Sequence, residues 1–294
     1  MTDELPIPLH TAIIGAPEQS APAQPEPDAV ASQQRVVFLH GLFGRGKNFT
    51  RIASGLLPEA QSLLLDLPNH GASGWTSRFD YLEMADLVAA HLRAGFASDG
   101  PVDVVGHSMG GKVAMVLALR HPDLVRRLVV IDISPAPSAA SRGDFVHLLS
   151  SRAGLDLATL ERRVDAHERL REAIPNDTVR GFLLQNLRRV EAGDPAAPGG
   201  AGFAWEPNLH LLHEEIATVM GFPDLRGSVF EGPVLWIRGE RSDYVSDEDG
   251  PAMRELFPRT RRVTVRGVGH WVHSEKPDEV IAALRAFLLD SGSA

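Results

Sequence analysis

The apolar residues of this chain gather in short continuous runs that end in glycine, proline or polar residues. The runs occupy residues 35–41, 62–71, 101–108, 127–135, 232–240 and 261–271. Continuous apolar runs of this length suit strands that are buried on both faces, as in a parallel sheet. A further strand is expected at residues 9–15, ahead of a proline-rich loop at 16–27.

Between these runs the apolar positions recur at helical spacing. Residues 79–96 place Ala85, Val88 and Leu92 on one side of a helix, and residues 111–123 form a short apolar segment that stops at a proline. Strand and helix therefore alternate along most of the chain. This alternation predicts an α/β fold with a doubly wound, mostly parallel sheet.

The alternation breaks between residues 137 and 228. Three segments there have the apolar spacing of amphipathic helices, at residues 156–174, 176–190 and 208–220, and no run of comparable strength suggests a strand. We therefore expect a helical lid inserted into the sheet domain. The expected domain limits are an N-terminal strand and proline-rich loop at 1–34, a core at 35–136 and 229–294, and the lid at 137–228.

Composition narrows the classes of function. The chain of 294 residues has a net charge of −9, which argues against nucleic acid as a partner because phosphate binding needs clustered Lys and Arg. It has no cysteine, which excludes thiol catalysis and cysteine-bound metals. No apolar stretch is long enough to span a membrane, and the N-terminus does not resemble a secretory signal, so we expect a cytoplasmic protein.

The segment Gly106–Gly110 reads G-x-S-x-G, with an apolar run before it and an apolar helical segment after it. This is the context of a nucleophile elbow, a strained strand-to-helix turn that lifts a serine hydroxyl clear of the sheet. Bulky neighbours would clash in such a turn, which explains the flanking glycines. The pattern predicts that Ser108 is a catalytic nucleophile.

Two other motifs suggest different chemistry. Gly41, Gly46 and Lys47 fall at the spacing of a phosphate-binding P-loop, but Asn48 stands where the magnesium-binding hydroxyl would be. His210 and His213 could share a helix face and hint at a metal site, but their order matches neither H-E-x-x-H nor H-x-x-E-H, and a position on the surface of a lid helix is favoured. We therefore expect neither a nucleotide nor a metal, and no cofactor.

A serine nucleophile in this fold needs a base late in the chain, and His270 follows the last apolar run where a loop should cross the sheet edge. The backbone amides of Met109 and Leu42 are the candidate oxyanion-hole donors, with Phe43 as an alternative to Leu42 and a candidate substrate contact. The glycines around Leu42 would let the backbone approach a substrate closely.

The residues alone leave the third catalytic group open. In many α/β hydrolases the acid is the aspartate of a G-x-x-D pattern that follows the strand after the lid. In this chain Ser242 occupies the position of that aspartate, and Asp243 follows one residue later. Asp132 follows the strand after the nucleophile helix and could also lie near the histidine. Both aspartates remain candidates at this stage.

Several stretches together resemble the YbfF-type esterases and their mitochondrial abhydrolase-domain relatives, over residues 35–289. The most specific are "GHSMGGK" and "GHWVHSEKP", supported by "HGLFG", "DLPNHGAS", "VVIDISP" and "GPVLWIRGERSDYV". The resemblance implies an α/β-hydrolase fold, places the acid at Asp132, and gives Ser242 the role of assisting the histidine. The carboxylate at Asp243 departs from that pattern.

We therefore expect a serine hydrolase that cleaves ester or thioester bonds of small acyl substrates through an acyl-enzyme. Ser108 argues against hydrolases with a carboxylate nucleophile. Carbon–carbon bond hydrolysis, perhydrolysis and a non-catalytic ligand-binding role are the alternatives, because fold alone does not fix chemistry. Four apolar residues of the lid are candidates to line an acyl pocket over Ser108, or else only pack the lid against the core. They are Phe182, Leu183, Leu187 and Trp205.

Overall fold

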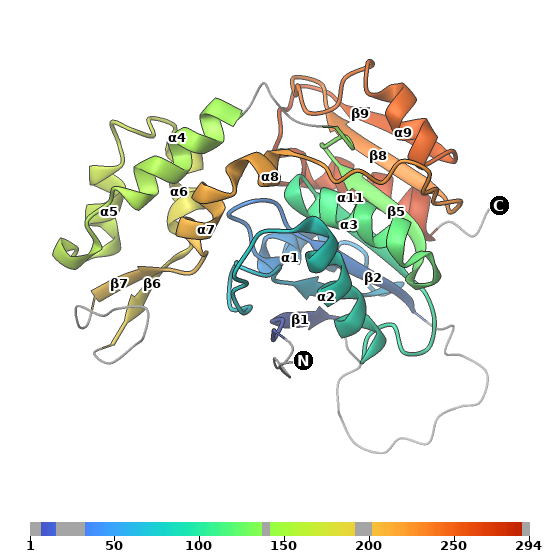
Figure 1. Ribbon diagram of the computed structural model, residues 1–294, viewed down its shortest axis with the longest axis horizontal. Coiled ribbons are helices and arrows are strands. Elements are labelled where there is room, and N and C mark those ends of the chain that lie inside the picture. Colours follow the sequence, from blue (N-terminus) through green and yellow to red (C-terminus); the bar gives the residue numbers. More distant parts are fainter. Residues whose placement is uncertain (1–6, 16–32, 137–141, 192–201, 290–294) are drawn as a thin grey trace.

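The computed structural model describes residues 7–15, 33–136, 142–191 and 202–289, and it confirms the predicted α/β fold (Figure 1). One seven-stranded sheet has the strand order β1-β3-β2-β4-β5-β8-β9. All neighbours pair in parallel except β1, which runs antiparallel to β3 at one edge. The strands are β1 (Thr11–Ile14), β2 (Gln34–Leu39), β3 (Ala60–Leu65), β4 (Val102–His107), β5 (Val125–Ile131), β8 (Val234–Gly239) and β9 (Thr260–Val265).

Helices cover both faces of the sheet, and alternate residues along each strand point to opposite faces. Val37 and Leu39 of β2 pack with α2 and α3, whereas Val36 and Phe38 pack with α1 and α11. These two apolar cores hold the sheet from both sides, which is why its strands read as continuous apolar runs. The helices of the sheet domain are α1 (Thr50–Ser54), α2 (Tyr81–Arg93), α3 (Met109–Arg120), α9 (Gly250–Leu256), α10 (Val272–Glu275) and α11 (Pro277–Leu284).

Residues 142–228, which we call the insertion, lie to one side of the sheet, and their last helix lies beside α3 (Figure 1). In the described part of the insertion, three α-helices precede a two-stranded hairpin and two follow it. Its elements are α4 (Arg142–Ala153), α5 (Arg163–Arg169), α6 (Asp177–Leu184), β6 (Leu187–Val190), β7 (Gly202–Trp205), α7 (Leu209–Glu214) and α8 (Ile216–Met220).

The expectation that the insertion is purely helical was wrong. The segment predicted as one helix at 176–190 ends as a helix at Leu184, and Leu187 begins a strand that pairs antiparallel with β7. The carbonyls at the end of helix α6 are satisfied from outside the helix: Arg163 donates to that of Leu184 at 3.0 Å, and Arg45 donates to that of Gln185. The segment predicted at 156–174 is likewise shorter, and α4 had no predicted counterpart.

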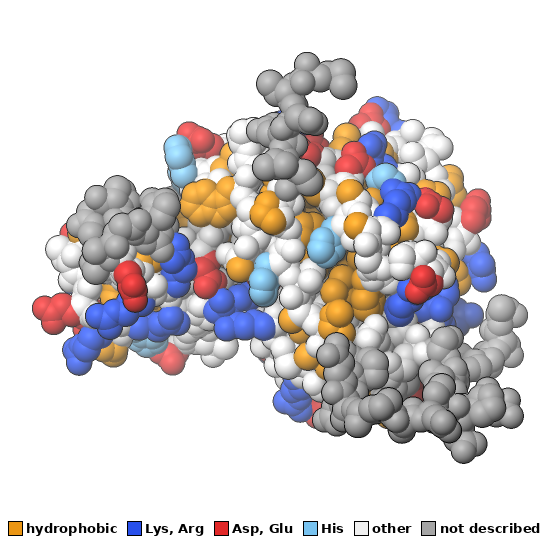
Figure 2. Space-filling model, turned by 90° about the horizontal axis from the view of Figure 1, so that it is seen from below, with side chains coloured by type: hydrophobic (Ala, Val, Ile, Leu, Met, Phe, Trp, Pro, Cys, Tyr) orange, Lys and Arg blue, Asp and Glu red, His pale blue; other side chains and the backbone are white. Residues whose placement is uncertain are grey.

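The domain limits at residues 137 and 228 stay a prediction. The proline-rich loop at 16–27 lies outside the described residues, as does most of the loop between β6 and β7. Figure 2 shows Lys and Arg side chains along the part of the surface formed by the insertion, with Asp and Glu side chains among them. None of the helices in the described ranges is both long and apolar enough to cross a bilayer.

Candidate active site

Ser108 occupies the sharp turn between β4 and α3. Its backbone φ of 52° and ψ of −120° are strained for a residue with a side chain. A Cβ on Gly106 would lie 2.3 Å from the Gly110 carbonyl oxygen, and one on Gly110 would lie 2.3 Å from that of Leu39. Only glycine fits at both positions, so the G-x-S-x-G spacing follows directly from the packing of the turn.

Three side chains from loops at the carboxyl edge of the sheet form a hydrogen-bonded chain. His270 Nε2 lies 2.9 Å from Ser108 Oγ, and His270 Nδ1 lies 2.8 Å from Asp132 Oδ2. Ser108 follows β4, Asp132 follows β5 and His270 follows β9, so the parallel sheet brings distant segments to one edge. All three are buried or nearly so, which strengthens the electrostatic coupling between them.

Asp132 is held in place by more than the histidine. The Gly239 amide donates to Oδ1 at 2.8 Å, and the Ser242 hydroxyl donates to Oδ2. Asp132 also has a positive φ of 54°, and its own amide donates to the Ile237 carbonyl at 2.8 Å. The carboxylate therefore accepts three hydrogen bonds, which hold it in one orientation.

The structure separates the two aspartates that the sequence leaves open. Asp243 is exposed, whereas Ser242 beside it turns inward, as alternate side chains do at a strand end. Ser242 was expected to assist the histidine, and its hydroxyl bonds to Asp132. Any assistance from Ser242 to His270 therefore passes through the carboxylate.

The loop after β2 makes a tight turn beside the serine. The Gly44 amide donates to the Gly41 carbonyl at 2.8 Å, and Phe43 takes a left-handed φ of 63°. His40 fixes this turn, since its Nδ1 donates to the Gly41 carbonyl at 2.8 Å and its Nε2 accepts from the Leu67 amide at 2.9 Å. Leu42, at the tip of the turn, lines the same cavity as Ser108.

His107 joins the serine turn to the histidine loop. Its Nε2 donates to the backbone carbonyl of His270 at 3.0 Å, and its ring centroid lies 4.8 Å from that of His270 and 4.2 Å from that of His273. Burial lowers the pKa of His107 well below its usual value and lowers the pKa of His273 to about 3. Both rings are therefore neutral near pH 7. No spacing in the sequence singles out His107.

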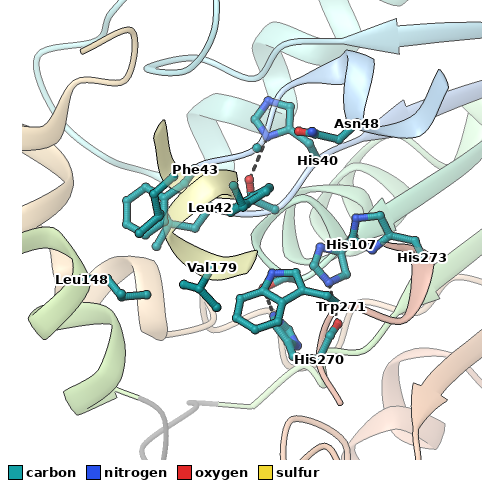
Figure 3. Close-up of a pocket in the computed structure, with 15 residues that line it drawn as sticks. His40, Leu42, Phe43, Asn48, His107, Leu148, Val179, His270, Trp271 and His273 are labelled. Atoms are coloured by element: carbon teal, nitrogen blue, oxygen red, sulfur yellow. Dashed lines mark hydrogen bonds between the residues drawn. The ribbon is translucent and has the colours of Figure 1, made fainter. Parts of the chain in front are cut away.

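A narrow cavity lies between the sheet domain and the insertion, and Ser108 and His270 are among the residues that line it (Figure 3). Phe43, Phe182 and Leu183 line it, and a role for them in binding substrate stays a prediction. Leu187 and Trp205 are not among its lining residues and pack within the insertion instead, which is the second of the two roles that the sequence left open. Leu187 is fully buried in the β6–β7 hairpin.

Trp205 instead packs on Arg152, a fully buried residue of α4 that the sequence did not single out. The guanidinium carbon of Arg152 lies 4.5 Å from the Phe43 ring centroid and 4.4 Å from that of Trp205. Burial lowers the pKa of Arg152 to about 9. None of its side-chain nitrogens has a hydrogen-bond partner among the described residues, so cation–π contacts hold it between the insertion and the Phe43 turn.

Residues of the P-loop-like segment and of the possible metal site make contacts that stabilise the fold. Asp66 accepts from the Gly46 amide at 2.7 Å and from the Ala72 amide at 3.0 Å, so it braces the loop that resembled a P-loop. His210 lies 3.6 Å from Glu214, and His213 lies 3.2 Å from the Ser150 hydroxyl. Within the described part of the chain, no cluster of three or more His, Asp or Glu side chains could hold a metal ion.

A doubly wound sheet with a serine at the strand-to-helix turn defines the class of α/β hydrolases. A family model described as the alpha/beta hydrolase fold matches residues 34–277. The chain therefore belongs to the α/β hydrolase fold family.

Particular relatives narrow the comparison. The sn-1-specific diacylglycerol lipase ABHD11 of Mus musculus is 35% identical over 271 residues, which cover 89% of this chain and 83% of that protein. Esterase YbfF of Escherichia coli (strain K12) is 29% identical over 255 residues, which cover 87% of this chain and 93% of that protein. The solved structure of a marine microorganism esterase superposes with a TM-score of 0.84 at 29% identity, covering 96% of this chain and 100% of the other. The resemblance seen in the sequence is confirmed.

Proposed function

We propose that this protein is a serine esterase that cleaves carboxylic ester or thioester bonds through an acyl-enzyme formed on Ser108. The observation that carries the proposal is the hydrogen-bonded chain from Ser108 through His270 to Asp132. The names of the relatives, two esterases and a lipase, support ester hydrolysis as the reaction.

The geometry suggests how the first half of the reaction proceeds. Ser108 Oγ attacks the carbonyl carbon of the ester while His270 Nε2 takes the hydroxyl proton. The negative charge that develops on the carbonyl oxygen faces the amides of Leu42 and Met109, our candidate oxyanion donors. When the intermediate collapses, the imidazolium gives its proton to the departing alcohol or thiol, and the acyl group stays on Ser108.

Deacylation repeats these steps with water as the nucleophile. A water molecule in the vacated cavity loses a proton to His270 Nε2 and attacks the acyl carbon; when this second intermediate collapses, the imidazolium returns the proton to Ser108 Oγ and the free acid leaves. Asp132 accepts a hydrogen bond from the Nδ1–H group throughout, so it keeps Nε2 available as the base and stabilises the imidazolium. A small-molecule ester is the proposed substrate. A cytoplasmic location stays a prediction.

The test is turnover of p-nitrophenyl esters by Ser108→Ala. We expect the rate to fall by about 10³-fold or more, because the variant cannot form the acyl-enzyme. Ser62→Ala is the matched control, since Ser62 is also a buried serine but lies in β3, and its hydroxyl has no hydrogen-bond partner among the described residues. Retention of more than about a tenth of the wild-type rate in Ser108→Ala would refute the proposal.

A further inference from the structure

The carboxamide of Asn186 reaches from the insertion to the turn that carries Leu42. Asn186 lies between the last residue of α6 and the first residue of β6, and its side chain is fully buried. Its Nδ2 donates to the Phe43 carbonyl at 2.6 Å and to the Leu183 carbonyl at 3.4 Å. Carbonyl oxygens only accept hydrogen bonds, so the NH₂ group must be the end of the carboxamide that faces them.

Two peptide groups connect Asn186 to the Leu42 amide. The Phe43 carbonyl shares a peptide group with the Gly44 N–H, and that N–H donates to the Gly41 carbonyl at 2.8 Å. The Gly41 carbonyl in turn shares a peptide group with the Leu42 N–H, our candidate oxyanion donor. A trans peptide group is planar and its C=O and N–H point in opposite directions, so a contact that fixes the carbonyl also fixes the amide.

The same contacts make the Leu42 amide a stronger donor. Hydrogen bonds in a chain polarise one another, so a donor on the carbonyl of a peptide group strengthens the N–H of that group. Asn186 polarises the peptide group between Phe43 and Gly44, and the Gly44 amide polarises the one that ends in the Leu42 N–H. His40 acts on this second group from the sheet side, through the Gly41 carbonyl (Figure 3).

Other contacts anchor the segment that carries Asn186. Arg45 forms an ion pair with Glu206 at 2.8 Å and donates to the Gln185 carbonyl. The Glu206 amide donates to the Asn186 carbonyl at 2.9 Å, which holds the backbone at that point. Loss of the Asn186 carboxamide should therefore release the Phe43 carbonyl and leave the insertion in place.

We infer that Asn186 is a positioning residue for the oxyanion hole, and that it acts on the Leu42 amide through the peptide group between Phe43 and Gly44. Asn186 is not among the described residues that line the cavity beside Ser108, so it acts through the turn and not on the substrate. The inference rests on the proposed function. It gives the insertion a part in the chemical step in addition to its place in the cavity wall.

The test is Asn186→Leu, which preserves most of the side-chain volume and removes the donor. With p-nitrophenyl butyrate, we expect kcat per active serine to fall by about tenfold to 100-fold, because loss of a direct oxyanion donor costs about 10²–10³ and Asn186 acts through one. KM should change by less than about threefold, since the interaction strengthens only in the transition state. Titration with a fluorophosphonate counts the active serines, so unfolded molecules do not lower the measured kcat.

Gln185→Leu is the matched control. It removes the neighbouring carboxamide, whose Oε1 accepts from Asn48 at 3.1 Å, and leaves the Phe43 carbonyl contact intact. We expect its kcat to stay within about twofold of wild type. Asn186→Ala removes the donor without adding apolar atoms and should behave like Asn186→Leu.

A transition-state analogue separates positioning from a merely structural role. An alkyl trifluoromethyl ketone adds Ser108 and presents an oxyanion to the same amides, so its Ki should rise by the factor by which kcat/KM falls. An unchanged Ki, a loss confined to KM, an equal loss in Gln185→Leu, or failure of both Asn186 variants to fold would overturn the inference and leave ester hydrolysis intact. A wild-type protein that does not cleave p-nitrophenyl butyrate would instead refute the proposed function.

Discussion

Replacing Asp132 by asparagine should abolish most turnover without changing the shape of the site. The Gly239 amide donates to Oδ1 at 2.8 Å, so the asparagine oxygen must take that position. Its NH₂ group then occupies the Oδ2 position, 2.8 Å from His270 Nδ1, and forces Nδ1 to accept a hydrogen bond. The imidazole proton moves to Nε2, which can no longer take the proton of Ser108.

The size of this effect follows from the wrong tautomer. An asparagine at the equivalent position of a serine hydrolase triad lowers turnover by about 10⁴-fold, or about 5 kcal/mol of transition-state stabilisation. The assay is the initial rate of p-nitrophenyl acetate hydrolysis, with thermal unfolding as a check on the fold. Asp243→Asn is the control and should stay within about tenfold of wild type, because Asp243 is exposed. An inactive Asp243→Asn beside an active Asp132→Asn would refute the reasoning.

Three further outcomes follow from the site. Ser242→Ala should lose about tenfold in turnover, a loss between those of the two aspartate variants, because it removes one of three hydrogen bonds to Asp132. A loss as large as that of Asp132→Asn would contradict this supporting role of Ser242. His107→Phe should lower kcat by about tenfold with KM unchanged. His107→Gln should restore most of the lost kcat, because the glutamine amide can donate to the His270 carbonyl. Equal kcat values for the two variants would show that the donor is irrelevant. Between pH 6.5 and about 3 the unfolded chain binds a proton at His273 that the folded protein does not, so the free energy of unfolding falls as the pH drops. In urea titrations, His273→Phe should therefore lose about 2 kcal/mol less than wild type between pH 7 and pH 5, and an equal loss would contradict the burial argument.

Local sequence patterns were sufficient to predict the strands of the sheet and the turn that carries Ser108. The strands are continuous apolar runs because both of their faces are covered, and glycine is required at 106 by the Gly110 carbonyl within the turn and at 110 by the Leu39 carbonyl of β2. Both features leave a signal in residues close together in the sequence. The β6–β7 hairpin was missed because its two strands are separated by a loop, and because Arg45, which bonds a carbonyl at the end of the preceding helix, lies far earlier in the chain.

The choice between Asp132 and Asp243 also needed the tertiary structure. A shift of one residue reverses the direction of a side chain, and only the positions of β5 and β8 show which carboxylate meets His270. Lys112 and Arg152 were missed because charged residues are expected at the surface. Their partners are backbone carbonyls and aromatic rings from distant segments, which no spacing in the sequence reveals.

The central claim is that Ser108 becomes acylated, and covalent labelling tests it most directly. A fluorophosphonate reacts with a serine that an adjacent base activates, and peptide mass spectrometry locates the adduct. The account predicts one adduct on Ser108 in the wild-type protein, no adduct in Ser108→Ala, and undiminished labelling in Ser62→Ala. A wild-type protein that hydrolyses esters while its adduct forms on a different serine would contradict it.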